Sequence, residues 1–184
     1  SDYFVIPGLG ANWMLPSGNG SVGISIYGNG GMNTDYDAST FHGGPTTGVD
    51  LMQLFIAPTY ARKLNENHSF AITPIIALQR FEVKALQAFG AFGFSSSPDN
   101  LTNEGHDTAF GYGARIGYMA NISPMFSFGA SYQTKIYMDE LDDYKGLFAE
   151  QGDFDIPANL TVGLTVRPSD TLTFLFDVQH IFYS

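Results

Sequence analysis

TAFGYGARIGYMANISPMFSFGASYQTKIYM, residues 108–138, decides the fold because side-chain character alternates through it at every second position. Large apolar side chains share one face of residues 108–121, while small residues and Arg115 share the other. The apolar face holds Phe110, Tyr112, Ala114, Ile116 and Tyr118. Residues 125–138 repeat the pattern after a turn at 121–124. Because successive side chains of a strand point to opposite faces, this period predicts two antiparallel strands.

The predicted hairpin has a consistent register and an unusual length. Pairing Arg115 with Ser131 and Gly113 with Gln133 places both polar faces on one side of the sheet, as a hairpin requires. Each segment has fourteen residues, whereas strands usually have about 5–6. A tilted strand needs about 9–11 residues to cross a bilayer. The length therefore favours strands that span a membrane.

Similar segments recur along the chain and bring the total to about eight strands. They cover about 10–15, 21–28, 49–62, 70–79, 158–166 and 172–179. The connections alternate between short ones (16–20, 63–67, 122–124, 168–170) and long ones (29–47, 82–107, 139–156). This alternation is typical of outer-membrane barrels, which have short periplasmic turns and long extracellular loops. Pro58 and Pro74 each lack a ladder donor, so they predict bulges or kinks.

Composition favours a membrane barrel over a soluble β-sandwich, whose strands would also alternate. Charged residues are 14% of the 184 residues and aromatic residues 15%, whereas about 25% of residues in soluble domains are charged. No stretch approaches the ~18 apolar residues of a transmembrane helix. We predict an all-β fold: an antiparallel up-and-down transmembrane β-barrel, with long extracellular loops and a short helix in one loop. Residues 1–184 form a single barrel domain or barrel segment.

The sequence also excludes several chemistries. The chain has no cysteine, which removes disulfides, thiolate metal sites and cysteine nucleophiles. A net charge of -10 with only eight Lys and Arg argues against nucleic acid as a partner. The four histidines lack metal-ligand spacing, and there is neither a Gly-x-Ser-x-Gly elbow nor a phosphate loop. We expect no enzyme activity, no cofactor and no metal.

Two stretches resemble one known family. Residues 142–159, DDYKGLFAEQGDFDIPAN, resemble the acidic loop with a short helix that leads into a Pro-Ala-Asn strand start in the long-chain fatty acid transporter family of outer membranes, the FadL/TodX group. Residues 11–14, ANWM, followed by residues 27–34, YGNGGMNT, are similar to the same family. The resemblance extends over nearly the whole chain but covers only a middle portion of the family pattern.

The resemblance implies an architecture, a location and a function. Members of the family have fourteen strands and an N-terminal hatch that plugs the lumen, so the chain is expected to be part of a larger barrel without its hatch, although eight strands could close alone. No signal peptide is visible at the N-terminus. The implied function is passive uptake of long-chain fatty acids or aromatic hydrocarbons through the cell outer membrane. The ligand leaves sideways through a wall opening made by a kinked strand.

The resemblance also sets the expected partners and the competing functions. We expect a hydrophobic small-molecule ligand, surrounding membrane lipid or detergent, lipopolysaccharide at the outer loops, and a monomeric barrel. Two alternatives stay open: a structural or adhesive outer-membrane barrel without a ligand, and a soluble β-protein that binds lipid inside a cup.

The candidate ligand-binding residues fall into two apolar groups and one polar group. Exposed apolar clusters in loops usually indicate binding, and the long connection at 82–107 contains Leu86, Phe89, Phe92 and Phe94. The alternative is that these side chains extend the flanking strands and pack on a neighbouring loop. Leu147 and Phe148, on the expected short helix, could complete the groove, or could pack inward.

The polar candidates are Arg115 and Lys135, which face the lumen by parity together with Gln133 and Asp177. A buried cation could hold a fatty carboxylate through charge-assisted hydrogen bonds. The alternative is ordinary ion pairing and solvation in a polar lumen.

Overall fold

The computed structural model describes residues 6–38 and 46–183, and within them one antiparallel sheet dominates. Eight long strands follow one another in the order β1-β2-β3-β4-β5-β6-β8-β9, which confirms the predicted number and the up-and-down arrangement. Their bounds are β1 Gly8–Met14, β2 Gly20–Tyr36, β3 Thr47–Lys63, β4 His68–Lys84, β5 Asp107–Asn121, β6 Phe126–Gln133, β8 Ala158–Ser169 and β9 Leu172–Phe182. A two-residue strand, β7 Tyr137–Met138, also pairs with β5.

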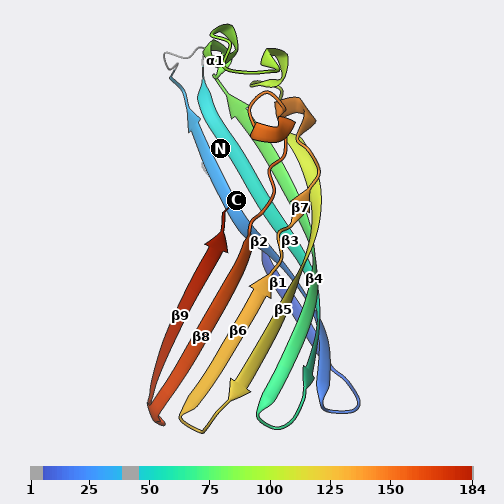
Figure 1. Cartoon of the computed structure of the whole chain (residues 1–184), viewed down its shortest axis with the longest axis vertical. Helices are drawn as coiled ribbons and strands as arrows, with labels where there is room; N and C mark the ends of the chain where they lie inside the picture. The colour runs from blue at the N-terminus through green and yellow to red at the C-terminus, as the bar shows by residue number, and fades with distance from the viewer. Residues whose placement is uncertain (1–5, 39–45, 184) are drawn as a thin grey trace.

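The sheet curves like part of a barrel wall (Figure 1). All short connections lie at its lower end and the long ones at its upper end, as the alternation of connection lengths predicts. Within the described residues β1 pairs only with β2 and β9 only with β8, so this chain does not close the sheet. No described helix is both long and apolar enough to cross a membrane.

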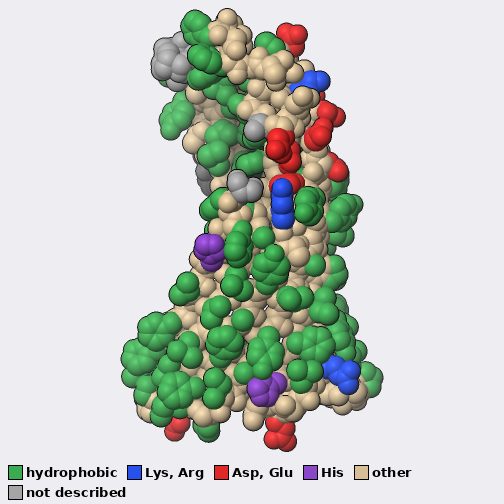
Figure 2. Space-filling view, in the orientation of Figure 1, with side chains coloured by type: hydrophobic (Ala, Val, Ile, Leu, Met, Phe, Trp, Pro, Cys, Tyr) green, Lys and Arg blue, Asp and Glu red, His purple; other side chains and the backbone are tan. Residues whose placement is uncertain are grey.

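The wall has an apolar outward face and a luminal face with smaller side chains. On β5 the outward Tyr112 is 64% exposed and Ile116 55%, while the luminal Ala109 is fully buried. On β4 the outward positions from Phe70 to Leu78 are all apolar: Phe70, Ile72, Pro74, Ile76 and Leu78. Figure 2 shows hydrophobic side chains gathered over the lower part of the wall. An apolar band of this height matches the ~9–11 residues of a bilayer crossing.

The hairpin of β5 and β6 keeps the predicted faces but not the predicted register. Arg115 lies opposite Gln133 and Gly117 opposite Ser131, two residues away from the expected pairing. The turn lies one residue later than predicted, because Ile122 N donates to Phe126 O and Phe126 N donates to Ser123 O. A shift of two residues preserves the faces, since the side-chain period is two.

The predicted continuous strand at 125–138 is wrong, because the chain breaks after Gln133. Gln133 pairs with Arg115 and Tyr137 pairs with Tyr112, so four steps on one strand match three on the other. One extra residue inverts the parity. Ile136, expected on the outward face, is therefore luminal and fully buried. It packs where a side chain on Gly113 would lie.

The bulges expected at Pro58 and Pro74 are not formed, because Ile56 pairs with Ile76 and Tyr60 pairs with Ile72 in one register. The ladder between β3 and β4 is only interrupted at these prolines, since neither supplies an N–H donor. The long connection predicted at 29–47 begins later than expected, because β2 continues to Tyr36. Residues 39–45 of that connection lie outside the described part of the chain.

A bulge interrupts β2, which the sequence analysis did not predict. The pairing with β3 shifts between Gly28, opposite Leu54, and Gly30, opposite Gln53, so that Asn29 is the extra residue. A hollow of about 200 Å³ lies beside it, next to Ile6 and Pro7. Because bulges locally bend a strand, we expect β2 to bend at this point.

Candidate ligand-binding site

The connections at the upper end of the wall fold back onto its luminal face. Buried side chains of β3, β4 and β5 meet buried side chains from residues 136–156 in one cluster. The cluster consists of Phe55, Ile75, Ala77, Phe81, Val83, Ala109, Ile136, Met138, Leu141, Tyr144 and Ile156. We call residues 139–157 the inner loop, because it covers the luminal side of these strands.

Four aromatic rings form a stack where the inner loop meets β4. Phe81 contacts the edge of Tyr144 with ring centroids 4.9 Å apart, and it contacts Phe148 at 5.1 Å. Phe148 in turn stacks on Phe154 at 4.9 Å with an angle of 19° between the rings. Such pairs add about 0.5–1.5 kcal/mol each beyond area burial. The aromatic stack gives the upper lumen an apolar wall.

Tyr144 connects the aromatic stack to the other long connection, residues 85–106, which we call the outer loop. Its hydroxyl donates to Gly105 O and accepts a hydrogen bond from Val83 N. Burial raises the pKa of the Tyr144 hydroxyl, so this group stays neutral and keeps its donor. The ring is therefore anchored at both its apolar face and its polar end.

A second contact between the two loops requires a glycine. Gly146 N donates to Asn100 O, and Ser95 Oγ donates to Gly146 O at 2.7 Å. A side chain at this position would overlap the backbone oxygen of Ser97. Only glycine permits so close an approach of two backbones.

The outer loop displays the phenylalanines predicted as ligand contacts. The one described α-helix, α1 Gln87–Ala91, and the 3-10 turn η1 Pro98–Asn100 lie within this loop. Phe92 and Phe94 are 73% and 77% exposed, and their ring centroids are 6.4 Å apart. The ring centroid of Phe89 lies 6.3 Å from that of Phe94. Leu86 instead packs against the buried cluster. An exposed apolar cluster thus lies next to a buried one.

The short helix expected around Leu147 and Phe148 is not formed there. The inner loop has two 3-10 turns, η2 Asp142–Tyr144 and η3 Ala149–Gln151, and both residues lie between them. A left-handed conformation at Glu150 and Gln151 prevents a regular helix. Leu147 and Phe148 are half-buried and pack on the cluster beneath.

The structure separates the two predicted luminal cations. Arg115 is half-buried on the luminal side, and its Nη2 donates to Gln133 Oε1 at 2.6 Å. Lys135 faces outward instead, because the extra residue after Gln133 inverts the parity. Its Nζ lies 5.3 Å from the ring centre of Tyr137 and 2.6 Å from Asp155 Oδ2.

A row of hydrogen-bonded amide side chains, which we call the amide chain, crosses the luminal face. The sequence does not predict it. Asn29 Nδ2 donates to Gln53 Oε1 at 3.1 Å, Gln53 Nε2 to Gln79 Oε1 at 2.7 Å, and Gln79 Nε2 to Phe154 O at 3.5 Å. The amide chain links the β2 bulge to the inner loop. The alternation along β4 predicts that Gln79 is luminal, but its hydrogen-bond partners depend on how β4 pairs with β3.

Replacement of Gln79 by Leu is expected to loosen the inner loop. Gln79 is fully buried, so the substitution leaves Gln53 without its acceptor and Phe154 O without its donor, at about 1–3 kcal/mol for an unsatisfied buried group. Hydrogen exchange of residues 139–157 in the whole protein should become about tenfold faster or more. Gln179→Leu, at an exposed luminal position on β9, is the control. Equal exchange in both variants would contradict the role of the amide chain.

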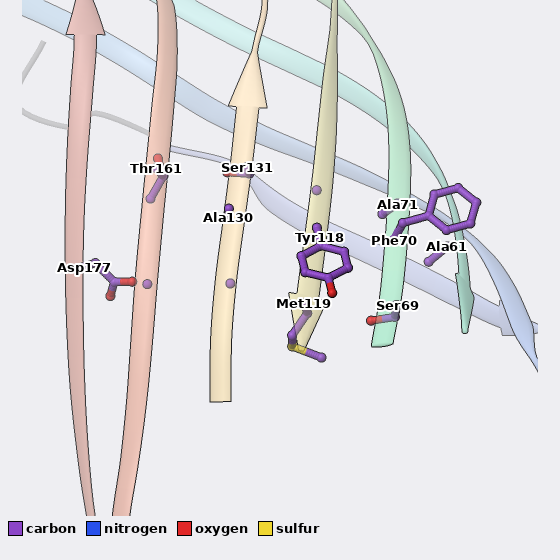
Figure 3. Close-up of a pocket in the computed structure, with 13 residues that line it drawn as sticks. Ala61, Ser69, Phe70, Ala71, Tyr118, Met119, Ala130, Ser131, Thr161 and Asp177 are labelled. Carbon is purple, nitrogen blue, oxygen red and sulfur yellow. The ribbon is translucent and has the colours of Figure 1, made fainter. Parts of the chain in front are cut away.

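The lower luminal face is lined by small side chains. A hollow of about 380 Å³ lies there, and its lining residues come from β3, β4, β5, β6, β8 and β9 (Figure 3). Gly117, Gly129, Ser131 and Gly163 are among them, and the carboxylate of Asp177 occupies the space that a side chain on Gly163 would fill. Small residues here leave open space below the inner loop.

In the described ranges, 6–38 and 46–183, no group of three or more His, Asp or Glu side chains has an arrangement that could hold a metal ion. What the site offers is an apolar surface. An exposed phenylalanine cluster lies on the outer loop, an aromatic stack lies inside the wall, and the amide chain leads to the bulge. This arrangement suits a ligand that prefers hydrocarbon to water.

Comparison with known proteins gives one family and several structures. The sequence pattern of the family described as outer membrane protein transport protein (OMPP1/FadL/TodX) matches residues 5–184. No curated protein matches the chain significantly.

Solved structures of similar fold include three bacterial proteins. The toluene transporter TodX of Pseudomonas putida has a TM-score of 0.74 at 16% identity. The match covers 96% of this chain and 54% of the TodX chain. The toluene transporter TbuX of Ralstonia pickettii gives 0.69 at 20% identity, covering 94% and 54%. A FadL homologue of Pseudomonas aeruginosa gives 0.65 at 14% identity, covering 95% and 48%. The chain thus spans about half the length of these structures.

Proposed function

The chain belongs to the outer membrane protein transport family (OMPP1/FadL/TodX), and from this premise we propose that the protein takes up hydrophobic small molecules through the outer membrane. The ligand class is long-chain fatty acids or aromatic hydrocarbons. Uptake is passive and requires no catalysis. TodX and TbuX are toluene transporters that share the fold at low identity, so the ligand of this protein is our inference.

The observation that supports the proposal is apolar surface both at the top of the wall and inside it. Phe92 and Phe94 expose large rings at the top of the wall. Leu86 of the same loop packs on the buried cluster, and Phe148 packs on it as well. Solvent-exposed rings of this kind are costly unless they meet an apolar partner. We propose that the ligand first binds at the exposed phenylalanines and then moves along the aromatic stack.

The remaining steps use the luminal face and the bulge. Arg115 has guanidinium donors beyond the one given to Gln133, and we assign it to the carboxylate of a fatty acid ligand. The exit is proposed at the β2 bulge, next to the hollow beside Ile6 and Pro7. Sideways release into the bilayer spares an apolar molecule from entering water. Lys135 has no part in this route, because it faces outward.

The test compares two double variants of the whole protein. Phe92→Ser with Phe94→Ser removes apolar surface worth about 1.5–3 kcal/mol per fully buried ring, so binding of oleate or toluene should weaken at least about tenfold. Phe92→Leu with Phe94→Leu keeps most of that surface and should stay within about threefold of wild type. Isothermal titration in detergent provides the measurement.

Two results would contradict the proposal. Wild-type protein that binds neither oleate nor toluene would remove the uptake function altogether. Binding that is equally strong in the serine and leucine variants would leave uptake standing but would move the entry site away from the outer loop.

A further inference from the structure

A charged hollow lies on the outward face of the wall, directly above the apolar band. On β4 the last apolar outward residue is Leu78, and the next outward positions are Arg80, Glu82 and Lys84. A 17-residue strand such as β4 is roughly 55 Å long, while a bilayer crossing uses only about 9–11 residues. The hollow therefore lies at the height of the outer-leaflet headgroups.

Six charged or titratable side chains line this hollow: Asp35, Asp50, Arg80, Glu82, Lys84 and His106. His106 Nε2 lies 2.9 Å from Asp50 Oδ2, 3.2 Å from Glu82 Oε2 and 2.7 Å from Arg80 Nη2. The ion pairs between side chains of opposite charge are looser. Arg80 lies 3.6 Å from Asp50, and Lys84 lies 3.8 Å from Glu82. Both cations thus remain beyond hydrogen-bond distance of the carboxylates.

Two polar groups in the hollow still lack a hydrogen-bond partner. Within the described ranges the Lys84 ammonium makes no hydrogen bond, and its side chain is 35% exposed. Asp50 Oδ1 is buried and makes no hydrogen bond in that part of the chain, whereas the Asp50 carboxylate as a whole interacts with the side chains of His106 and Asn33. An oxygen of this kind is available to accept a hydrogen bond from a ligand hydroxyl.

The hollow has room for a ligand because a glycine occupies its centre. Gly48 lies between Asp35 on β2 and Lys84 on β4, and it places no side chain between them. Any side chain there would also overlap the carbonyl oxygen of Thr34. The resulting space is about 260 Å³.

We propose that this hollow binds the phosphorylated sugar headgroup of an outer-leaflet glycolipid. Arg80 and Lys84 contact the phosphate through charge-assisted hydrogen bonds. A sugar hydroxyl donates to Asp50 Oδ1, the acceptor that lacks a partner. The acyl chains of the same lipid lie against the apolar band, which begins at Leu78 on β4 and at Phe110 on β5.

The proposal goes beyond uptake and does not depend on it. The hollow is on the outside of the wall, where β3 and β4 each have a paired strand on both sides. A lipid bound in the hollow would hold the barrel among its lipids. It would also hold the base of the outer loop, because His106 is the last residue of that loop and lines the hollow. Failure of ligand uptake would leave this site unaffected, since neither Phe92 nor Phe94 belongs to it.

The test measures lipid A binding to the whole protein in detergent by native mass spectrometry. Arg80→Gln with Lys84→Gln should weaken binding of lipid A at least about tenfold. Arg62→Gln is the matched control, because Arg62 is an outward cation at the opposite end of β3, and it should change binding less than about twofold. Heat-modifiable gel mobility, equal in all variants, reports that the barrel is folded.

Three further probes separate the headgroup from simpler ligands. Lipid A without phosphates and phosphatidylethanolamine should both bind at least about tenfold more weakly than lipid A. Equal binding of dephosphorylated lipid A would overturn the proposal, and so would equal loss in the Arg62→Gln control. Displacement of lipid A by millimolar inorganic phosphate would also overturn it, because the site would then recognise phosphate alone.

Discussion

Arginine in place of Ile116 is expected to destabilise the folded wall by about 2–4 kcal/mol in a bilayer, the cost of a cation on the lipid-facing side near the membrane centre. Ile116 is 55% exposed on the outward face and lies opposite Ile72, within the apolar band. The substitution therefore places a charge in hydrocarbon. Urea unfolding of the whole protein in lipid vesicles measures the change in the free energy of unfolding.

The matched control introduces the same side chain on the other face. Ser131→Arg lies one strand away on β6, opposite Gly117, and lines the luminal hollow (Figure 3). Water in the lumen can solvate this arginine, so a cost within about 1 kcal/mol is expected. If both variants lose the same stability, the outward face does not meet lipid, and the membrane assignment of the two faces fails.

The faces of the wall could be predicted from sequence because they depend only on parity. Tyr112 and Ile116 share an outward face in the structure, as their spacing indicates. A register error of two residues does not change which face a side chain is on. The predicted pairing of Arg115 with Ser131 is therefore wrong, but both side chains lie on the predicted face. A rule that depends only on odd and even positions tolerates such errors.

Parity fails where one extra residue enters a strand. Thr134, Lys135 and Ile136 continue the alternation of polar and apolar residues, so the sequence of this segment does not indicate the break after Gln133. The cause lies on the neighbouring strand, where Gly111 and Gly113 leave the luminal space that Met138 and Ile136 fill. Sequence reading of one segment cannot detect vacant space on another, and for this reason Lys135 was assigned to the lumen.

The candidate site was predictable in its apolar parts and not in its polar ones. Phe92 and Phe94 are conspicuous because large apolar residues are unusual in a long loop. The amide chain, by contrast, joins Asn29, Gln53 and Gln79 from three separate strands. Each of these residues alone resembles an ordinary polar lumen residue. Only the register of β2, β3 and β4 brings them into line.

Alanine in place of Gly146 is expected to separate the inner and outer loops and to weaken ligand binding at least about tenfold. The added methyl group would overlap Ser97 O, a backbone atom that cannot move away alone. Relief of that overlap breaks the hydrogen bonds of Gly146 to Asn100 and Ser95, each worth about 0.5–1.5 kcal/mol. The phenylalanines of the outer loop then lose their position above the aromatic stack.

The same substitution at Gly117 is the control for this prediction. A methyl group there would lie 4.0 Å from Ala130 O, an ordinary contact, so Gly117→Ala should bind oleate or toluene like wild type. Hydrogen exchange across residues 85–106 and 139–157 should rise in the Gly146 variant only. Unchanged exchange with weakened binding would place the effect at Gly146 itself, whereas faster exchange with unchanged binding would show that the ligand does not need the two loops joined.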